Sequence, residues 1–273
     1  MSAPPGWYSD PGGNPQWRWW DGVQWTGHVA PAVRGPARPD PAALVAGERQ
    51  IARWARMALP AQALIQPTAM LLMWRFFDSF FGFAAAMEAS PGEVPGYPFG
   101  FGRVVQIQLG MQLVNLVSLA CLVVLAVWFF RAAQAAANLG LPARRSPGLA
   151  TASWFIPGVN LWWPCESTRD LLPPGHDTRR RITWLWVVGM AAGLLTMLGL
   201  FAVMFDAILG MAASSGEAGL PRGAGIPVGF QALTIVGSLT TAGVLVAARG
   251  VVADVLAEHE VLLRSQGAPQ DRA

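Results

Sequence analysis

The chain has 273 residues, of which 53% are hydrophobic and only 13% are charged, and its formal net charge is +3. A composition this apolar is unusual for a soluble domain and typical of integral membrane proteins. All of the positive charge lies on arginine, because the sequence has no lysine. The arginines stand in short segments beside apolar blocks rather than in one basic patch, so nucleic acid is not an expected partner.

The first part of the chain, residues 5–29, is rich in tryptophan and in turn residues. Two turn signals, at residues 11–13 and at Asp21-Gly22, separate three short aromatic runs. This pattern predicts a two- or three-stranded β-hairpin or meander, with a type I′ turn at Asp21-Gly22. So short a segment buries little surface, and its packing must come from aromatic side chains. These side chains are also the candidate partner-binding residues: Trp7, Tyr8, Trp17, Trp19, Trp20 and Trp25.

The same runs carry the pattern Gly-Trp-Tyr-x-Asp-Pro, then Arg-x-Trp-Asp-Gly, then Trp-Thr. This pattern resembles the short tryptophan-rich module of unknown function at the N-terminus of many actinobacterial membrane proteins. A proline-rich stretch follows over residues 30–43, and its composition predicts an extended, semi-rigid linker.

Four apolar blocks follow, at about residues 57–74, 104–130, 182–209 and 226–248, within a membrane domain predicted at 44–265 and before a tail at 266–273. Each block is long enough to cross a hydrocarbon core of about 30 Å as a helix. The first block is the weakest because Pro60, Gln62, Gln66 and Pro67 interrupt it. We expect an all-α membrane protein, a four-transmembrane-helix bundle behind a small β module.

The arginine distribution predicts the orientation of this bundle. Arginines gather before the first block, between the second and third blocks, and in the C-terminal tail, whereas the loops around Glu93 and Glu217 hold about one each. This alternation predicts a multi-pass protein of the plasma membrane. Both termini and the tryptophan-rich module are then cytoplasmic.

The connection between the second and third blocks contains an apolar segment, residues 147–164, with arginines on both sides. Pro157 and Pro164 interrupt it, so we expect it to be re-entrant or to lie on the membrane surface rather than to cross. Pro164 is also expected to begin a short helix.

The stretch from Trp128 to Pro164 resembles an actinobacterial four-helix membrane domain family of unknown function, which often follows the tryptophan-rich module. The residues that match its motif are Trp128, Arg131, Asn138, Ser146, Pro147, Trp154, Pro157, Asn160 and Pro164. The resemblance implies an architecture and a region of interest, but no reaction.

Side chains suited to catalysis are scattered along the sequence. His28, His176 and His259 lie in three different segments, with no serine, cysteine or carboxylate pair at a motif spacing. Cys121 and Cys165 lack metal-ligand spacing. We therefore expect no enzyme activity, no cofactor and no metal site.

Two further patterns lie inside the apolar blocks. Gln108, Gln112 and Asn115 recur at i, i+4 and i+7, which places them on one face of a helix, where they either bond to neighbouring helices or line a polar path. Gly189 and Gly193 form a GxxxG pair, which predicts a close helix approach within the bundle or in a homo-oligomer.

Two classes of function fit these features. In the first, the protein is a membrane-anchored interaction or scaffold protein whose cytoplasmic module binds a protein or a proline-rich peptide. In the second, it is a small-solute transporter or a lipid-sensing protein that uses the amide face of the second span. We favour the first, because that face lacks the paired charges and broken helices that are typical of transporters.

Overall fold

The computed structural model of the protein describes residues 3–31, 39–89, 101–214 and 228–267. It contains two compact units, Met1–Pro39 and Asp40–Ala273. The predicted loops around Glu93 and Glu217 lie outside the described residues, as do residues 32–38 of the linker, 226–227 of the fourth predicted span and 268–273 of the tail.

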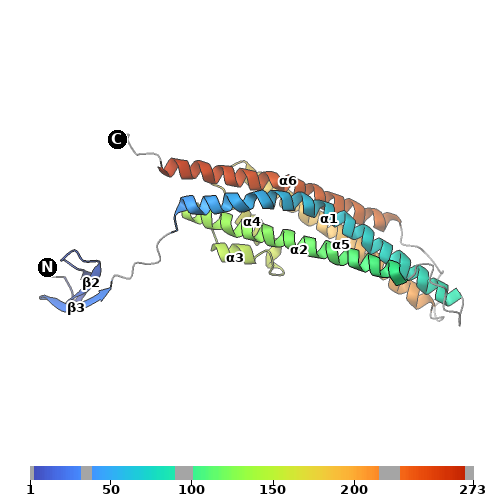
Figure 1. Ribbon diagram of the computed structural model, residues 1–273, viewed down its shortest axis with the longest axis horizontal. Coiled ribbons are helices and arrows are strands. Elements are labelled where there is room, and N and C mark those ends of the chain that lie inside the picture. The colour runs from blue at the N-terminus through green and yellow to red at the C-terminus, as the bar shows by residue number, and fades with distance from the viewer. Residues whose placement is uncertain (1–2, 32–38, 90–100, 215–227, 268–273) are drawn as a thin grey trace. The chain divides into compact units, whose positions relative to one another are not determined.

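The first unit is a three-stranded antiparallel sheet of β1 (Gly6–Ser9), β2 (Gln16–Trp20) and β3 (Trp25–Pro31), in the order β1-β2-β3 (Figure 1). The meander prediction is confirmed. The turn between β1 and β2 is organised by Asp10, whose carboxylate accepts hydrogen bonds from the Gly12 N–H and from the side chains of Asn14 and Gln16. These bonds satisfy polar groups of a turn that has little core beneath it.

The turn between β2 and β3 differs from the prediction. A type I′ turn needs positive φ at both Asp21 and Gly22, but in the described part of the chain only glycines have positive φ, Gly22 among them at 102°. The loop instead spans residues 21–24, and Asp21 Oδ1 accepts from the backbone N–H groups of Val23 and Gln24, both at 2.7 Å. The carboxylate thus fixes the loop and Asp21 keeps an ordinary backbone conformation.

The second unit is helical. Its long helices are α1 (Pro41–Ala89), α2 (Phe101–Asn138), α5 (Thr178–Ser214) and α6 (Val228–Gly267), and between α2 and α5 lie α3 (Pro147–Ala152), the 3₁₀ turn η1 (Val159–Leu161) and α4 (Trp163–Arg169). Three of the described helices, α2, α5 and α6, are long and apolar enough to cross a membrane. The first predicted span lies within the continuous helix α1, but its prolines and glutamines make it less apolar. A fourth crossing, by α1, therefore stays a prediction.

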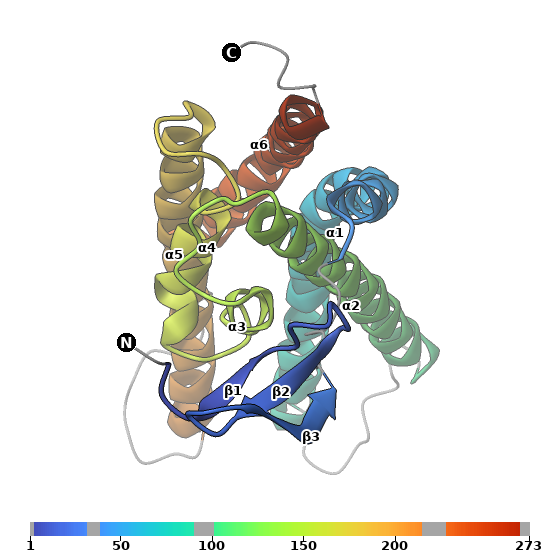
Figure 2. The same ribbon diagram turned by 90° about the vertical axis from the view of Figure 1, so that its left-hand side faces the viewer.

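The long helices pack in the order α2, α1, α6, α5, while α3 rests on α2 and α4 rests on α5 (Figure 2). Gln62 of α1 donates to Ser118 Oγ of α2 at 2.8 Å. α5 and α6 approach each other closely at Gly237, where a Cβ atom would lie 2.8 Å from the carbonyl oxygen of Ala192.

Within the bundle, the GxxxG pair is not the place of the close approach, and its alternative role in a homo-oligomer stays a prediction. A Cβ atom on Gly193 would meet nothing within 4 Å, and one on Gly189 would make only an ordinary contact with Val244. The reason is the rotation of α5, which turns Ala192 and Thr196 toward α6, so that the glycine needed for close packing is on α6 instead.

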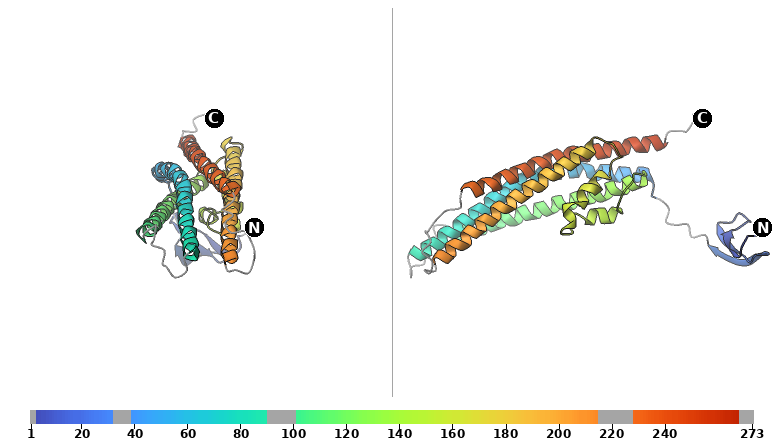
Figure 3. Two further views of the ribbon diagram at one scale, coloured as in Figure 1. Left: turned by 90° about the vertical axis from the view of Figure 1, so that its right-hand side faces the viewer. Right: turned by 180° about the vertical axis from the view of Figure 1, so that it is seen from behind.

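The buried core of the helical unit lies at one end, where α1 begins and α6 ends (Figure 3). We call this end the head and define it as residues 41–59, 128–182 and 248–267. Its fully buried side chains include Ala55, Ala132, Leu172 and Val255. In contrast, only 11% to 22% of the residues in the apolar windows of α2, α5 and α6 are buried inside the unit. The spans thus present their apolar side chains outward, as helices in lipid do.

Candidate functional site

The tryptophan-rich sheet has two aromatic faces, because successive side chains of a strand point to opposite sides. Trp7 is paired with Trp19 across β1 and β2, with ring centroids 5.5 Å apart, and Trp17 lies two residues from Trp19 on the same face. On the other face, the ring of Trp25 meets Trp20 at 5.2 Å and Tyr8 at 6.2 Å, each edge to face. The six aromatic residues thus form two separate groups.

The face with Tyr8, Trp20 and Trp25 is partly covered by residues 3–5, although Trp25 stays 38% exposed, and we call it the covered face. The hydroxyl of Tyr8 donates to the carbonyl oxygen of Pro4 at 2.8 Å, and the indole N–H of Trp20 donates to that of Ala3 at 3.0 Å. The ring of Pro5 lies over Gly22, where a Cβ atom would come within 3.2 Å of Pro5 Cγ. The module therefore already binds a proline-containing segment through aromatic donors.

The opposite face, with Trp7, Trp17 and Trp19, is the open face. Trp7 and Trp17 are 46% and 44% exposed. Within the described residues, no hydrogen-bond partner faces the indole N–H of any of these three side chains. The open face thus combines a flat aromatic surface with three available donors.

The carboxylate of Asp10 connects the first turn of the sheet to its central strand. Asp10 is buried at the first turn, and the hydrogen bonds from Asn14 and then Gln16 lower the pKa of its carboxyl group. Arg18, in the middle of β2, forms an ion pair with the same carboxylate at 3.1 Å. This arrangement ties the first turn to the central strand.

Trp154 of the family motif joins α2 to α5. Phe129 of α2, next to the buried Trp128, meets the ring of Trp154 at 5.8 Å, and Trp154 in turn meets Trp186 of α5 at 5.5 Å. The indole N–H of Trp186 donates to the carbonyl oxygen of Leu161 at 3.1 Å. The apolar segment that the sequence predicted as re-entrant or surface-lying therefore packs between α2 and α5, and its position in the membrane stays a prediction.

Other motif residues begin the short helices. Ser146 caps α3, since its hydroxyl accepts from the N–H of Leu149 at 3.4 Å, and Pro147 occupies the first turn, where its missing N–H costs nothing. Pro164 is buried in the first turn of α4, so a short helix starts there as predicted.

The remaining motif residues lie near the same segment. Arg131 lies over Gly47 of α1, with 3.7 Å between its Nη1 and the place of a Cβ on that glycine. Asn138 donates to the carbonyl oxygen of Gln134 in its own helix. Pro157 and Asn160 are exposed in the turn between α3 and α4. The motif thus accounts for caps, turns and packing around the connection.

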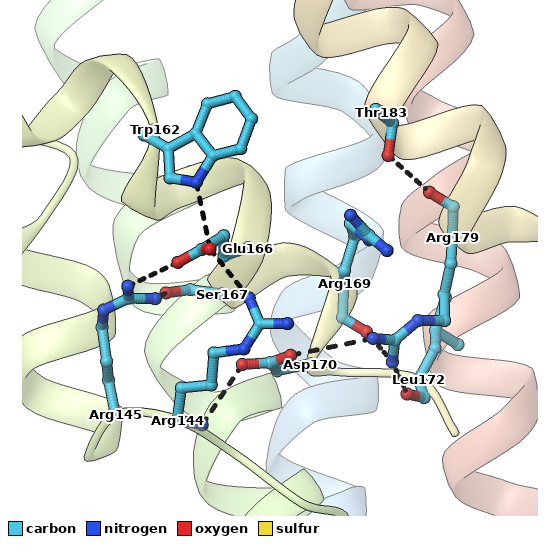
Figure 4. Close-up of polar contacts among 10 residues, drawn as sticks. All are labelled: Arg144, Arg145, Trp162, Glu166, Ser167, Arg169, Asp170, Leu172, Arg179 and Thr183. Atoms are coloured by element: carbon cyan, nitrogen blue, oxygen red, sulfur yellow. Dashed lines mark hydrogen bonds and ion pairs between the residues drawn. The ribbon is translucent and has the colours of Figure 1, made fainter. Parts of the chain in front are cut away.

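A charged cluster anchors the connection from the other side (Figure 4). Glu166 of α4 accepts hydrogen bonds from the guanidinium of Arg145 and from the indole N–H of Trp162, and it forms an ion pair with Arg144 at 3.0 Å. The bond from Arg145 is the main reason why the pKa of Glu166 is lowered. Arg145 also stacks over the ring of Trp163, 4.2 Å from its centroid.

Arg179, at the start of α5, holds the end of α4 in place (Figure 4). Its Nη1 donates to the carbonyl oxygens of Arg169 at 2.8 Å and Leu172 at 2.7 Å, and its Nη2 lies 3.9 Å from Asp170. Asp170 also accepts from the backbone N–H of Arg144 at 3.2 Å. Charged side chains therefore hold the chain where it leaves α4, next to the buried Leu171 and Leu172.

A buried polar pair in the head was missed by the sequence reasoning. His259 of α6 and Glu48 of α1 are both 0% exposed, with Nδ1 and Oε2 2.6 Å apart. His259 Nε2 lies 2.8 Å from the carbonyl oxygen of Leu171, and because a carbonyl only accepts, Nε2 carries a hydrogen. One further proton then lies between Nδ1 and Glu48. Within the described residues, Glu48 Oε1 has no hydrogen-bond partner.

The signal for this pair was helical periodicity rather than a motif. Glu48 follows Val45 by three residues and precedes Ala52 by four, and both neighbours are buried. A charged residue on such an apolar stripe points into the protein and needs a partner. His259 likewise follows the buried Val255 by four residues. His259 and Glu48 are 211 positions apart in the sequence, however, and no spacing rule links them.

The amides of α2 do not point into the bundle. Gln108, Gln112 and Asn115 are all exposed on the surface of the helix, whereas Gly110 and Ser118 face α1. The structure therefore brings these three residues together along one outer face.

The described residues contain no group of three or more His, Cys, Asp and Glu side chains that could hold a metal ion. Both cysteines are free and buried, and burial raises the pKa of Cys165.

Three apolar spanning helices and a small aromatic sheet define a multi-pass membrane protein with an N-terminal tryptophan-rich module. Residues 103–257 match the family described as Domain of unknown function (DUF4328), which is more than half of the 273 residues, so the chain belongs to this family. Residues 5–43 match Protein of unknown function (DUF2510). No curated protein and no solved structure matches the chain.

Proposed function

We propose that the chain is a membrane-anchored interaction protein whose tryptophan-rich module binds an extended, proline-containing peptide on its open face. The observation that supports this most is the segment Ala3–Pro5 on the covered face, where aromatic donors bind the carbonyl groups of Ala3 and Pro4. Extended proline-rich segments leave their carbonyl groups unbonded, and aromatic grooves are their usual receptors. The open face offers the same chemistry with three available indole donors.

The membrane part of this proposal has four crossings. α1 packs between α2 and α6. Gln62 of α1 contacts Ser118 and Leu72 contacts Gly110, and both of these α2 residues lie inside the second predicted span. If α2 and α6 cross the membrane, α1 crosses with them. The hydrogen bond from Gln62 to Ser118 lowers the free-energy cost of placing this amide in lipid.

The orientation in this proposal follows from the head, which holds the start of α1 and the end of α6 together with most of the arginines. Arginine-rich ends stay in the cytoplasm. Both termini and the module are then cytoplasmic, at the plasma membrane. The exposed Trp154, Phe155 and Trp162 of the connection lie at the headgroup level, where aromatic rings are favoured.

The test is binding of a fluorescent oligoproline peptide to the full chain in lipid nanodiscs. Replacing Trp7 and Trp17 by Ala removes the two most exposed indoles of the open face, and we expect binding at least about tenfold weaker, as for hot-spot tryptophans. Trp54→Ala, which removes an exposed indole from α1, is the matched control. Equal binding by the double variant and the parent chain overturns the proposal.

A further inference from the structure

Two of the exposed amides of α2, Gln112 and Asn115, lie too deep for water to bind them if the second span crosses at residues 104–130. Asn115 is eleven residues from the nearer end of that span, which is about 16 Å along a helix. Gln112 is only one turn closer to the end. Neither side chain reaches the headgroups from that depth, and lipid tails offer no hydrogen bond.

The described part of the chain does not satisfy these amides. Gln108, Gln112 and Asn115 are exposed, and no hydrogen-bond partner of their side chains lies among the described residues. Gln62, the amide of α1 at a similar depth, does have a partner in Ser118. The inward amide of Gln62 thus has a partner within the helical unit, whereas the outward row has none among the described residues.

The row continues along the helix as a packing seam. Gln108, Gln112 and Asn115 are followed by Leu119, Leu122 and Ala126, so the spacing alternates between four and three residues over the length of the span. That spacing is the a/d pattern of a left-handed helix pair. Leu119 and Leu122 are exposed as well, at 57% and 45%.

We propose that this seam is the contact between two copies of the chain, with α2 packed against α2 of the second copy. An amide both donates and accepts, so it is complementary to itself across a two-fold axis. Two copies inserted in the same orientation bring each residue opposite its own copy, so Asn115 meets Asn115 and Gln112 meets Gln112 at the same depth. The buried amides fix the register of the pair, as a single asparagine does in coiled coils.

The seam predicts which positions cross-link between copies. Chains with Gln112→Cys or Asn115→Cys, oxidised in native membranes, are expected to form a disulfide-linked dimer at least about tenfold faster than a chain with Leu113→Cys, which is 64% exposed on another face of α2. The native Cys121 and Cys165 are buried, so the parent chain gives the baseline. Equal cross-linking from Leu113 and from the seam, or cross-linking of the seam only to a different protein, overturns the proposal.

A second measurement keeps the inference independent of cysteine chemistry. The triple variant Gln108→Leu, Gln112→Leu, Asn115→Leu makes the span more apolar and leaves the head unchanged. Labelled copies are reconstituted in liposomes at decreasing protein-to-lipid ratios, and energy transfer between them falls as the pair dissociates. We expect the triple variant to lose half of its energy transfer at a protein-to-lipid ratio at least about tenfold higher than the parent chain does. An unchanged ratio contradicts the proposed contact between the two α2 helices.

Discussion

The head and the apolar spans of the helical unit are stabilised by different means. The head buries alanine, leucine and valine together with charged and polar groups such as Glu48, His259 and Asp170. The spans expose large side chains such as Leu194 and Phe201 along their length. The difference indicates that the head holds the fold together as the core of a soluble domain does, while lipid is the solvent for most of the span surface.

The largest expected effect is in the head, at the buried pair. His259→Leu leaves Glu48 buried with no hydrogen-bond partner on either oxygen, and we expect a loss of about 3–5 kcal/mol in the free energy of unfolding. Adding Glu48→Leu is expected to recover much of this loss, because no buried charge remains. Unfolding titrations in mixed micelles measure both.

The neighbouring pair Arg49–Glu260 joins the same two helices and is a matched control. The Arg49 side chain is 60% exposed, so Glu260→Gln is expected to cost less than about 1 kcal/mol. If His259→Leu and Glu260→Gln lower the free energy of unfolding equally, burial of the His259–Glu48 pair does not matter, and the comparison between head and surface is wrong at this position.

Gly237 is a point of close contact between two spans, α5 and α6. A Cβ there would lie 2.8 Å from the Ala192 carbonyl oxygen and would overlap Thr196 Oγ1. Gly237→Ala must therefore push α5 and α6 apart, at a cost of about 1–3 kcal/mol. Gly193→Ala, with open space around it, is the control and should be tolerated. A tolerated Gly237→Ala would show that the two helices are less closely packed than described.

A smaller effect is expected from pH. The pKa of Glu166 is lower in the folded protein than in the unfolded chain, so its bonds with Arg145 and Trp162 stabilise the fold above pH about 4.3 and are lost as pH falls through the folded pKa. We expect about 1–2 kcal/mol. The protection factors of residues 159–172 against hydrogen exchange, which correct for the intrinsic pH dependence of the exchange reaction, should fall at acid pH. In Glu166→Gln they should be low at neutral pH too, and protection factors in the parent chain that stay constant as the pH falls would contradict this role.

Hydropathy and turn signals predicted the elements of the fold well. Three apolar spans, the meander and the helix that begins at Pro164 needed only local sequence. The turn at Asp21 was predicted wrongly because side-chain capping replaced a special backbone conformation. The close approach at Gly237 was not predicted from the GxxxG pair, because helix rotation depends on the whole bundle.

The candidate site was harder to predict than the fold. The six aromatic residues were identified, but their separation into two faces depends on strand register, and the cover by Ala3–Pro5 depends on tertiary contacts. The pair Glu48–His259 joins helices at opposite ends of the sequence. Contacts of that kind leave only a weak periodic signal in a single sequence.

The most direct test of the difference between head and spans is one pair of substitutions measured in the same lipid. Leu172 is 0% exposed in the head, and Leu194 is 62% exposed on α5. We predict that Leu172→Ala lowers the free energy of unfolding by about 2–5 kcal/mol because it opens a cavity. Leu194→Ala should change it by less than about 0.5 kcal/mol, because lipid replaces the lost contacts. Equal losses at the two positions would contradict the account.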